Sequence, residues 1–224
     1  MVAQFDRDRL KEQLLHGASA LRVEINNVQA QLLLDYIAEL LRWNRAYNLT
    51  AITKPQQMVI RHLLDSLAVL PLIEGERLLD VGTGPGLPGM VLAIMAPQRE
   101  HHLLDSNGKK TRFLFHVKTH LGLNNVTEHH CRIEQHIPEK LYNRVTSRAF
   151  ASLDAMLMNC ESLVAEGGSI VAMKGKLPED EIAAIANLPT KAVWRLERAE
   201  PLAIPGLEEE ERYALILRRE QETA

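Results

Sequence analysis

The chain has 224 residues, which is enough for one sizeable α/β domain with a modest extension and too few for two full domains. Hydrophobic residues make up 46% of it and charged residues 25%, as in an ordinary globular protein, and no apolar run reaches the length of a membrane span. The net charge of −3 excludes a surface that is basic all over, so a nucleic-acid site would have to be a local basic face.

The first part of the chain, residues 1–72, is predicted to be a helical extension packed on a core of residues 73–224. Residues 1–15 mix acidic, basic and apolar side chains, so they do not have the composition of a signal peptide. Together with the absence of a membrane span, this favours a cytoplasmic protein.

Two helices are expected within the extension. Leu33, Ile37 and Leu40 recur at helical spacing, and Asn27 is a suitable N-cap for that helix. Residues 53–56, Thr-Lys-Pro-Gln, have the form of a capping box with proline in the first turn, so a second helix is expected to begin there. The buried stripe of the second helix would be Val59, Leu63, Leu67 and Leu70.

From Arg77 onward, short apolar runs alternate with helical stretches, which is typical of a parallel sheet covered on both faces. The last two strands are joined by a polar connection that contains Pro201, Pro205 and Gly206 and no helix, so they are expected to be antiparallel neighbours. Seven strands with one reversed near the edge indicate an α/β, Rossmann-like fold of the class I methyltransferase type. The predicted strands span residues 77–81, 100–105, 125–129, 144–149, 169–174, 192–199 and 212–218, and the predicted helices between them span residues 87–95, 109–121, 153–164 and 179–186.

A glycine-rich loop follows the first predicted strand. Gly82, Gly84 and Gly86 stand at alternate positions, and a helix is expected to begin near Leu87. Glycine permits positive φ and lets a ligand approach the backbone, and the first N–H groups of a helix favour a negative group. Ligands of open α/β sheets bind at the carboxyl ends of the strands, where this loop lies. The loop therefore predicts a ligand site, although glycine turns also follow strands that bind nothing.

Two cofactors fit this loop. Residues 84–89 match the G-x-G-x-x-G dinucleotide fingerprint, whereas residues 80–86 match the Asp-x-Gly-x-Gly-x-Gly loop of methyltransferases. Asp80 would repel a diphosphate but tolerate the cationic sulfonium of S-adenosylmethionine, and the chain leaves no room for the substrate domain of an NAD oxidoreductase. Asp105 ends the second strand and could bind the ribose hydroxyls of either cofactor, unless Asp105 or Ser106 simply caps the next helix. We expect S-adenosylmethionine as the cofactor.

The two cysteines, Cys131 and Cys160, are expected to be free and inert thiols in a reducing compartment. His129 and His130 precede Cys131, but adjacent residues of a strand point to opposite faces and do not converge on one ion. The sequence therefore predicts no metal site.

The chain resembles the bacterial RsmG methyltransferases, also called glucose-inhibited division protein B (GidB). The resemblance rests mainly on the loop of residues 80–89 and on the segment Ser147-Arg-Ala-Phe-Ala-Ser152. Shorter matching segments follow one another over residues 27–219. They are Trp43-Asn44 with Tyr47-Asn-Leu-Thr50, Arg61-His with Asp65-Ser66, Leu104-Asp-Ser106 with Lys109-Lys110, Arg132-Ile-Glu134, and Lys174-Gly175.

The resemblance implies methylation of N7 of one guanine in 16S ribosomal RNA, the family site G527, with S-adenosylmethionine as methyl donor. It also implies cofactor contacts from Gly82, Leu87, Ile133, Glu134 and Arg148, although Glu134 could be a helix-start acid and Arg148 a structural ion pair. The full set of expected cofactor-binding residues is Asp80, Gly82, Gly84, Gly86, Leu87, Asp105, Ile133, Glu134 and Arg148. Guanine N7 carries a lone pair and no proton, so no catalytic base is assigned.

Basic side chains are the candidates for contacts to RNA phosphate, which would make binding salt-dependent. Arg148 and Lys174 are the candidates for positioning the substrate. Arg61 is a candidate for binding RNA, or it could pair with Asp65 at i,i+4 instead. Trp43 and Tyr47 could stack on a base or pack in the core. The candidates for RNA contact are Arg61, Lys109, Lys110, Arg112 and Lys174, and further basic residues that could face RNA are Arg42, Arg45, Arg144 and Lys176.

Other functions remain open at this level. A small-molecule methyltransferase of the same fold would suit the net charge of −3, and a ribosome-associated protein could bind the cofactor without catalysis. The expected partner is 16S rRNA or the small ribosomal subunit, with naked RNA and the assembled subunit equally compatible. A monomer is the simpler expectation. Residues 1–26 and 219–224 have no assigned role.

Overall fold

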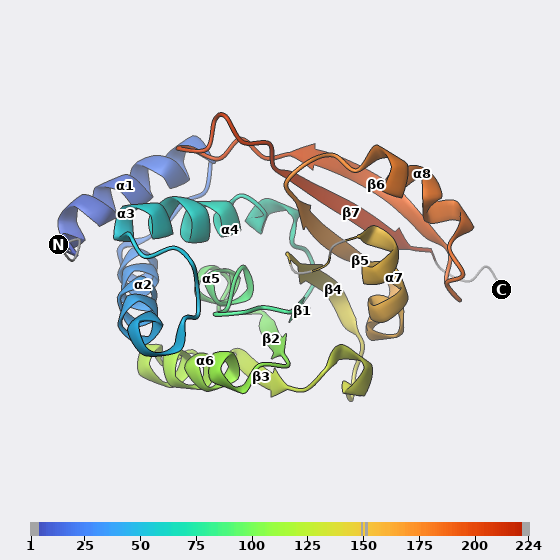
Figure 1. The fold of residues 1–224 in the computed structure, drawn as a ribbon, viewed down its shortest axis with the longest axis horizontal. Helices are drawn as coiled ribbons and strands as arrows, with labels where there is room; N and C mark the ends of the chain where they lie inside the picture. Colours follow the sequence, from blue (N-terminus) through green and yellow to red (C-terminus); the bar gives the residue numbers. More distant parts are fainter. Residues whose placement is uncertain (1–4, 149, 151, 221–224) are drawn as a thin grey trace.

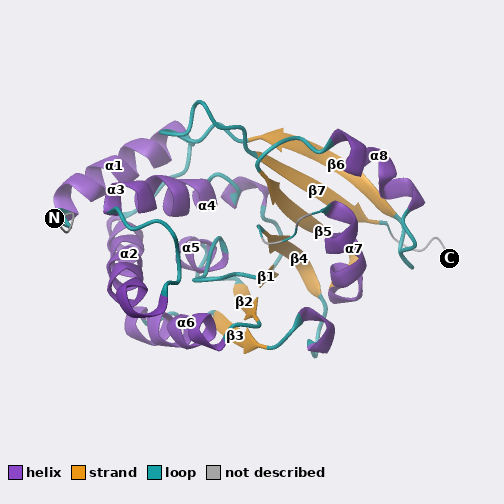
Figure 2. Ribbon diagram, in the orientation of Figure 1, coloured by secondary structure: helices purple, strands orange, loops and turns teal. Residues whose placement is uncertain are grey.

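The computed structural model of the chain describes residues 5–148, 150 and 152–220. Within them, seven strands form one sheet in the order β3-β2-β1-β4-β5-β7-β6, and helices cover both of its faces (Figures 1 and 2). The strands are β1 (Arg77–Val81), β2 (Glu100–Asp105), β3 (Val126–His130), β4 (Tyr142–Ser147), β5 (Val164–Lys174), β6 (Trp194–Pro201) and β7 (Tyr213–Arg219).

The predicted topology is confirmed. β1 pairs in parallel with β2 and β4, β2 with β3, and β4 with β5, whereas β7 is antiparallel to both β5 and β6. The bounds of β1 and β2 are those predicted, and β5 begins earlier, at Val164. Ala149, which would end the predicted strand 144–149, and Ala151 of the Ser147–Ser152 motif lie outside the described residues.

The N-terminal extension contains α1 (Arg7–Ala20), α2 (Asn27–Tyr47) and a third helical stretch. That stretch begins as α3 (Pro55–Met58), continues through the π-helical η1 (Val59–Leu64) into α4 (Asp65–Leu67), and is followed by the 3₁₀ turn η2 (Leu70–Leu72). The predicted stripe is confirmed at Val59, Leu63 and Leu67, which are fully buried, whereas Leu70 is half-buried.

Both predicted helix caps were misplaced. The side chain of Asn26, not of Asn27, accepts the Gln29 N–H, and Gln29 reaches back to the Asn26 N–H in a complete capping box. The expected capping box at residues 53–56 is wrong: Pro55 is the first helical residue, so Lys54 is the N-cap and makes no side-chain cap. Thr53 is one residue too early to serve.

One face of the sheet is covered by α5 (Gly89–Met95) and α6 (Gly108–Leu121); α2 packs against both of these helices, and α1 packs against α2 and η1 (Figure 1). A single hydrophobic cluster joins the layers, since Leu33 and Ile37 of α2 belong to it together with Met90 and Leu114. The extension therefore shares its core with the sheet domain. Among the described residues, none of the helices combines the length and hydropathy that a membrane span requires.

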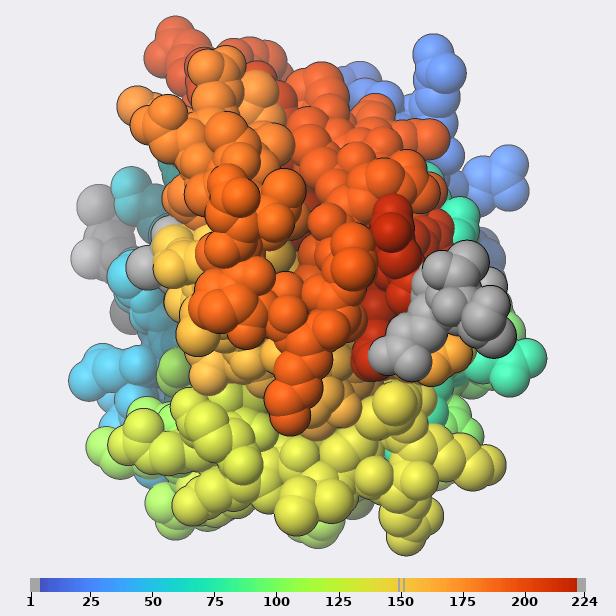
Figure 3. All heavy atoms as spheres, turned by 90° about the vertical axis from the view of Figure 1, so that its right-hand side faces the viewer, coloured from blue at the N-terminus to red at the C-terminus, as the bar shows by residue number. Residues whose placement is uncertain are grey.

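The opposite face is covered by α7 (Leu153–Cys160) and α8 (Glu179–Ala184), each followed by a 3₁₀ turn, η4 (Glu161–Leu163) and η5 (Ile185–Asn187). The two predicted helices 153–164 and 179–186 thus end early and tighten in their last turn. Figure 3 looks onto this side, which is occupied mostly by the segment from α7 to β7, in orange and red.

Alternation along β1 decides which way its side chains point. Leu78 packs with Val69 and Leu92 on the face covered by α5, whereas Leu79 and Val81 pack with the α7 cluster on the other face. Asp80 shares its direction with Leu78 because side chains alternate along a strand. This direction determines the role of Asp80 at the carboxyl end of the sheet.

Candidate functional site at the carboxyl edge of the sheet

The loop between β1 and α5 requires glycine. Gly82, Gly84 and Gly86 have φ angles of 64°, 63° and 106°, a region that L side chains rarely adopt. A Cβ at Gly86 would lie 2.8 Å from Cβ of Met90 and 3.0 Å from Cδ2 of Leu114. The loop is therefore pressed against α5 and α6, and of its three glycines only Gly82 is partly exposed.

Asp80 braces this loop from beneath. Its side chain is fully buried, and its Oδ2 accepts the Thr83 hydroxyl at 2.6 Å and the Gly89 N–H at 2.8 Å. Burial raises the pKa of Asp80 to about 6, against the lowering effect of these two hydrogen bonds and of the Arg148 charge. The sequence placed a ligand at the start of α5, but the inward-pointing Asp80 already occupies that helix terminus.

The extension holds the loop from the other side. The Tyr36 hydroxyl of α2 donates a hydrogen bond of 3.0 Å to the Pro85 carbonyl oxygen, and both groups are buried. Burial raises the pKa of Tyr36 far above its ordinary value, so the phenol stays protonated and remains a donor. The loop conformation is thus fixed by hydrogen bonds to Asp80 of β1 on one side and to Tyr36 of α2 on the other.

A pocket of about 290 Å³ opens beside Gly82, over the carboxyl ends of β1, β2 and β3; we call it the glycine-loop pocket. It brings together four of the residues expected to bind the cofactor: Gly82, Asp105, Ile133 and Glu134. Ile133 and Glu134 begin η3 (Ile133–Gln135), directly after β3. The pocket is not lined by the other five expected residues, which are Asp80, Gly84, Gly86, Leu87 and Arg148. Asp80, Gly84 and Gly86 instead determine the conformation of the loop beside the pocket.

Asp105 fixes the opposite wall of the glycine-loop pocket. Its Oδ2 accepts the Gly84 N–H at 2.9 Å and its Oδ1 accepts the Asn107 N–H at 2.8 Å, with Lys110 Nζ 3.4 Å from Oδ2. Neither Asp105 nor Ser106 caps α6, because Asn107 is the N-cap. A carboxylate has about four lone pairs, so Asp105 retains capacity for a further donor in the pocket.

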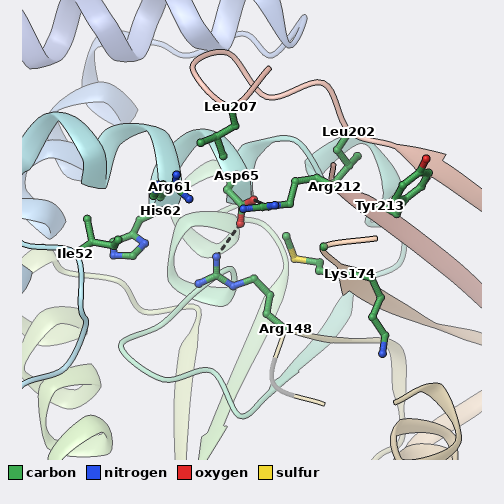
Figure 4. A pocket seen from close by; sticks show the side chains of 12 residues that line it. Ile52, Arg61, His62, Asp65, Arg148, Lys174, Leu202, Leu207, Arg212 and Tyr213 are labelled. Atoms are coloured by element: carbon green, nitrogen blue, oxygen red, sulfur yellow. Dashed lines mark hydrogen bonds and ion pairs between the residues drawn. The ribbon is translucent and has the colours of Figure 1, made fainter. Parts of the chain in front are cut away.

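A second pocket, of about 560 Å³, lies on the other side of β1 and is lined by three arginines, Arg61, Arg148 and Arg212; we call it the arginine pocket. Figure 4 shows their side chains around Asp65. The remaining lining residues are Ile52, His62, Met173, Lys174, Gly175, Leu202, Leu207 and Tyr213. The extension, the end of β5 and the β6–β7 connection thus each contribute one wall.

Ion pairs hold the three arginines in place. Asp65, whose side chain is 7% exposed, pairs with Arg148 at 2.7 Å and with Arg212 at 3.5 Å. Glu210 pairs with Arg212 at 2.7 Å and with both terminal nitrogens of Arg61. The alternative prediction that Arg61 pairs with Asp65 is therefore wrong. Arg148 does form an ion pair, and its partner Asp65 is nearly buried. The alternative of a structural role for Arg148 is compatible with this geometry.

Lys174 and His62 also line the arginine pocket, with different consequences for its charge. Lys174 Nζ lies 3.2 Å from Glu181 Oε2 of α8, so its charge is shared with that carboxylate. Burial and the Arg148 charge lower the pKa of His62 to about 4, and its Nε2 lies 3.0 Å from the Thr50 hydroxyl. His62 is neutral near pH 7, and the positive charge of the pocket comes from its arginines.

The expected RNA-contact residues divide between the two pockets. Arg61 and Lys174 line the arginine pocket, whereas Lys109, Lys110 and Arg112 lie in the first turns of α6, where Lys110 lines the glycine-loop pocket.

The further basic residues differ in exposure. Arg45 and Lys176 are exposed, and Arg42 is exposed but paired with Glu39. Arg144 was expected on the RNA side and is not: it is 2% exposed and pairs with Glu74, at the end of the sheet where β1 begins.

Two further groups behave as the residue types suggested. Trp43 is partly buried against Phe113 and His116, and it contacts Tyr47, so it packs within the helical layer. Cys131 and Cys160 are free, and burial raises the pKa of both thiols, that of Cys160 to about 12. In the part of the chain that the structure describes, no cluster of His, Cys, Asp or Glu side chains could hold a metal ion.

Three residues of the site were not singled out from the sequence. Tyr36 stood on the apolar stripe of α2, and a tyrosine on such a stripe signals a buried hydroxyl that needs a partner. Arg212 and Glu210 carried no such signal, because they belong to an acidic connection of ordinary composition. Only the packing of the β6–β7 connection against η1 brings them to Arg61.

The family of the chain follows from its similarity to known proteins. Residues 29–215 match the model of a family described as GidB, rRNA small subunit methyltransferase G. The chain is 54% identical over 183 residues to the ribosomal RNA small subunit methyltransferase G of Cellvibrio japonicus (strain Ueda107), covering 80% of this chain and 84% of that protein. It is 48% identical over 203 residues to the protein of the same name from Marinomonas sp. (strain MWYL1), covering 91% and 95%.

Solved structures with the same fold are more distant in sequence. A SAM dependent methyltransferase from Aquifex aeolicus superposes with a TM-score of 0.53 at 18% identity, covering 70% of this chain and 90% of that one. A SAM-dependent methyltransferase from Thiobacillus denitrificans, solved with S-adenosyl-L-homocysteine, gives a TM-score of 0.50 at 13% identity, covering 70% and 90%. At these identities the comparison establishes the Rossmann-like methyltransferase fold.

Proposed function

The chain belongs to the GidB family of rRNA small subunit methyltransferases, and we propose that it methylates N7 of a single guanine in 16S ribosomal RNA, the family site G527. It is an S-adenosylmethionine-dependent enzyme that acts on small-subunit rRNA. The observation that carries the proposal of a single guanine N7 is that two pockets lie at the same edge of the sheet. One is beside the glycine loop, and the other is lined by arginines. We place the enzyme in the cytoplasm.

The residues of the glycine-loop pocket fit the cofactor. Gly82 offers a backbone edge without a side chain, Asp105 retains acceptor capacity for ribose hydroxyls, and Ile133 with Glu134 forms a mixed apolar and polar wall suited to adenine. When bound there, S-adenosylmethionine supplies a methyl group made electrophilic by its sulfonium. Asp80 would act through the loop it braces, without touching the cofactor.

The substrate guanine would enter the arginine pocket. Its O6 is an acceptor next to N7, and the Arg148 guanidinium can donate to it and so orient the base. N7 has a free lone pair, so no side chain must remove a proton. The contribution of the protein is alignment and electrostatics, with Asp65 holding Arg148 in place.

The direct test is methyl transfer from labelled S-adenosylmethionine to rRNA from a strain lacking the gene, followed by mapping of the modified base. We expect one labelled guanine, modified at N7. Label on another atom or on no small-subunit guanine would contradict the proposal.

The role of Arg148 is tested separately. Arg148→Ala should lower the methylation rate by about 10- to 100-fold, the effect of a lost positioning contact, while calorimetry shows unchanged affinity for S-adenosylhomocysteine. Arg198→Ala is the control, since Arg198 is an exposed arginine of β6 that lines neither pocket. A large loss of cofactor affinity in Arg148→Ala would mean that Arg148 holds the cofactor instead of the base.

A further inference from the structure

We propose that Arg61 and Arg212 form a binding site for one phosphate of the RNA backbone, and that Glu210 occupies this site in the free protein. The inference rests on the proposed function and adds a contact that it does not specify: a phosphodiester near the nucleotide that enters the arginine pocket. The carboxylate of Glu210 would be exchanged for that phosphate when RNA binds.

The geometry around Glu210 is that of an anion held by two guanidinium groups. Arg61 Nη1 lies 3.1 Å from Glu210 Oε2, and Arg61 Nη2 contacts the other carboxylate oxygen, so this contact is bidentate. Arg212 Nη2 lies 2.7 Å from Oε2. Planar, bidentate guanidinium contacts suit carboxylate and phosphate equally, which makes a glutamate a structural stand-in for a phosphate.

Glu210 is the replaceable member of the group. Its side chain is 37% exposed and stands in the β6–β7 connection, whereas Arg61 is carried by η1 and Arg212 immediately precedes β7. The two arginines lower the pKa of Glu210 to about 2, so it remains an anion and must be displaced as one. Exposed ion pairs contribute little free energy, so a polyanion with several contacts can compete with it.

A second carboxylate, that of Asp65, would hold Arg212 in place after this exchange. Arg212 contacts Asp65 through Nε at 3.5 Å and Glu210 through Nη2, so loss of Glu210 leaves the Asp65 contact in place. Asp65 is 7% exposed and begins α4, whereas Glu210 is 37% exposed and stands in the β6–β7 connection. Arg61 keeps the contact of its Nε with Gln57 Oε1 at 3.3 Å. A phosphate would therefore meet Arg212 held by Asp65 and Arg61 held by Gln57, next to Arg148.

The direction in which Glu210→Gln changes RNA affinity shows whether Glu210 competes with RNA or supports the two arginines. Glu210→Gln removes the competing anion, so a fluorescent, unmodified small-subunit rRNA transcript should bind about fivefold tighter, as expected for relief of one exposed ion pair. Arg61→Ala and Arg212→Ala should bind it more weakly, each with a salt slope reduced by about one. Glu209→Gln makes the same charge change on an exposed neighbour that pairs with neither Arg61 nor Arg212 among the described residues, and it should bind within about twofold of wild type because an exposed charge is screened.

Several results would overturn the proposal. Weaker binding by Glu210→Gln would make Glu210 a support for the arginines, and equal gains in Glu210→Gln and Glu209→Gln would reflect overall charge alone. Wild-type binding by both arginine variants, with unchanged melting temperature, would exclude the phosphate site.

Failure of this proposal is separable from failure of the proposed function. Binding of the transcript does not depend on which atom is methylated, so mapping could place the methyl group elsewhere while the Glu210→Gln comparison still holds. Conversely, a mapped guanine N7 product combined with weaker binding by Glu210→Gln would retain the enzyme activity and remove the phosphate site.

Discussion

Gly82 and Gly122 have nearly the same φ angle and very different surroundings. Their φ angles are 64° and 67°, but Gly82 lines the glycine-loop pocket, whereas a Cβ at Gly122 would meet nothing within 4 Å. An L residue in this conformation costs about 1–2 kcal/mol, so alanine at either position should destabilise the fold by a similar amount. The two positions therefore separate a conformational effect from an effect on the ligand.

We expect Gly82→Ala to weaken S-adenosylhomocysteine binding by about tenfold, equivalent to about 1.4 kcal/mol, because a methyl group is added to the pocket wall. Gly122→Ala should bind as wild type. Isothermal titration calorimetry measures both affinities, and denaturant unfolding verifies that the two stability losses match. Unchanged affinity in Gly82→Ala would mean that the pocket is not the cofactor site.

Asp80 gives a prediction for pH. Its pKa is raised from 3.8 to about 6 in the folded protein, so the native state binds the proton more tightly than the unfolded chain. Stability from this group is therefore largest below about pH 4 and falls as the pH rises towards 6. The difference in unfolding free energy between Asp80→Asn and wild type should change over this window and be flat above it. A pH-independent difference would show that Asp80 does not titrate as a buried acid.

Four residues of the glycine-loop pocket were predicted from the sequence, but the direction of Asp80 was not. Gly82 and Asp105 could be placed because they stand at strand ends, which meet at one edge of a parallel sheet, whereas the Ile133-Glu134 pair came from the family resemblance. Both faces of β1 are apolar, so the pattern does not show which face Asp80 joins. Its inward direction follows from the packing of α5 against Leu78 and Asp80.

At the level of elements, α2 is the part of the extension that touches the glycine loop, through Tyr36. Tyr36→Phe should leave the buried Pro85 carbonyl without its partner and cost about 1–3 kcal/mol of stability. Because the loop would lose one of its two braces, we also expect a severalfold loss of cofactor affinity. Chemical denaturation and calorimetry measure the two effects. A stability loss with full cofactor affinity would show that α2 does not control the loop.

Element bounds were predictable where turn signals coincide with strand ends, as at β1 and β2. β5 extends to Val164 because its first part pairs with Tyr142, beyond a shift of register between Tyr142 and Arg144. The misplaced cap at residues 53–56 has a similar origin, since Pro55 takes the first helical position and shifts the cap by one residue. These errors concern local geometry that pairing and packing decide.

At the scale of the whole molecule, the fold gathers three arginines in one pocket of a chain whose net charge is −3. The arginine pocket combines Arg61, Arg148 and Arg212, which are far apart in the sequence. The position of Arg148 could be inferred from the end of the fourth strand. That of Arg212 could not, because the β6–β7 connection has no motif and its packing against η1 is a tertiary feature.

The extension and the sheet domain are expected to unfold together, because Leu14 of α1 is fully buried in the cluster that includes Met90 and Leu114. Leu14→Ala should lower the unfolding free energy by about 2–5 kcal/mol and retain a single cooperative transition. Val28→Ala, at a position that is 68% exposed, should have little effect. Two separate transitions in the Leu14→Ala protein would contradict a shared core.

The measurement closest to the central claim is a crystal structure of the protein with S-adenosylhomocysteine. We expect the ribose against Asp105, the adenine beside Ile133 and Glu134, and the sulfur end directed past Gly82 towards the arginine pocket. Density for the ligand among Arg61, Arg148 and Arg212, with the glycine-loop pocket vacant, would contradict the assignment of the two pockets.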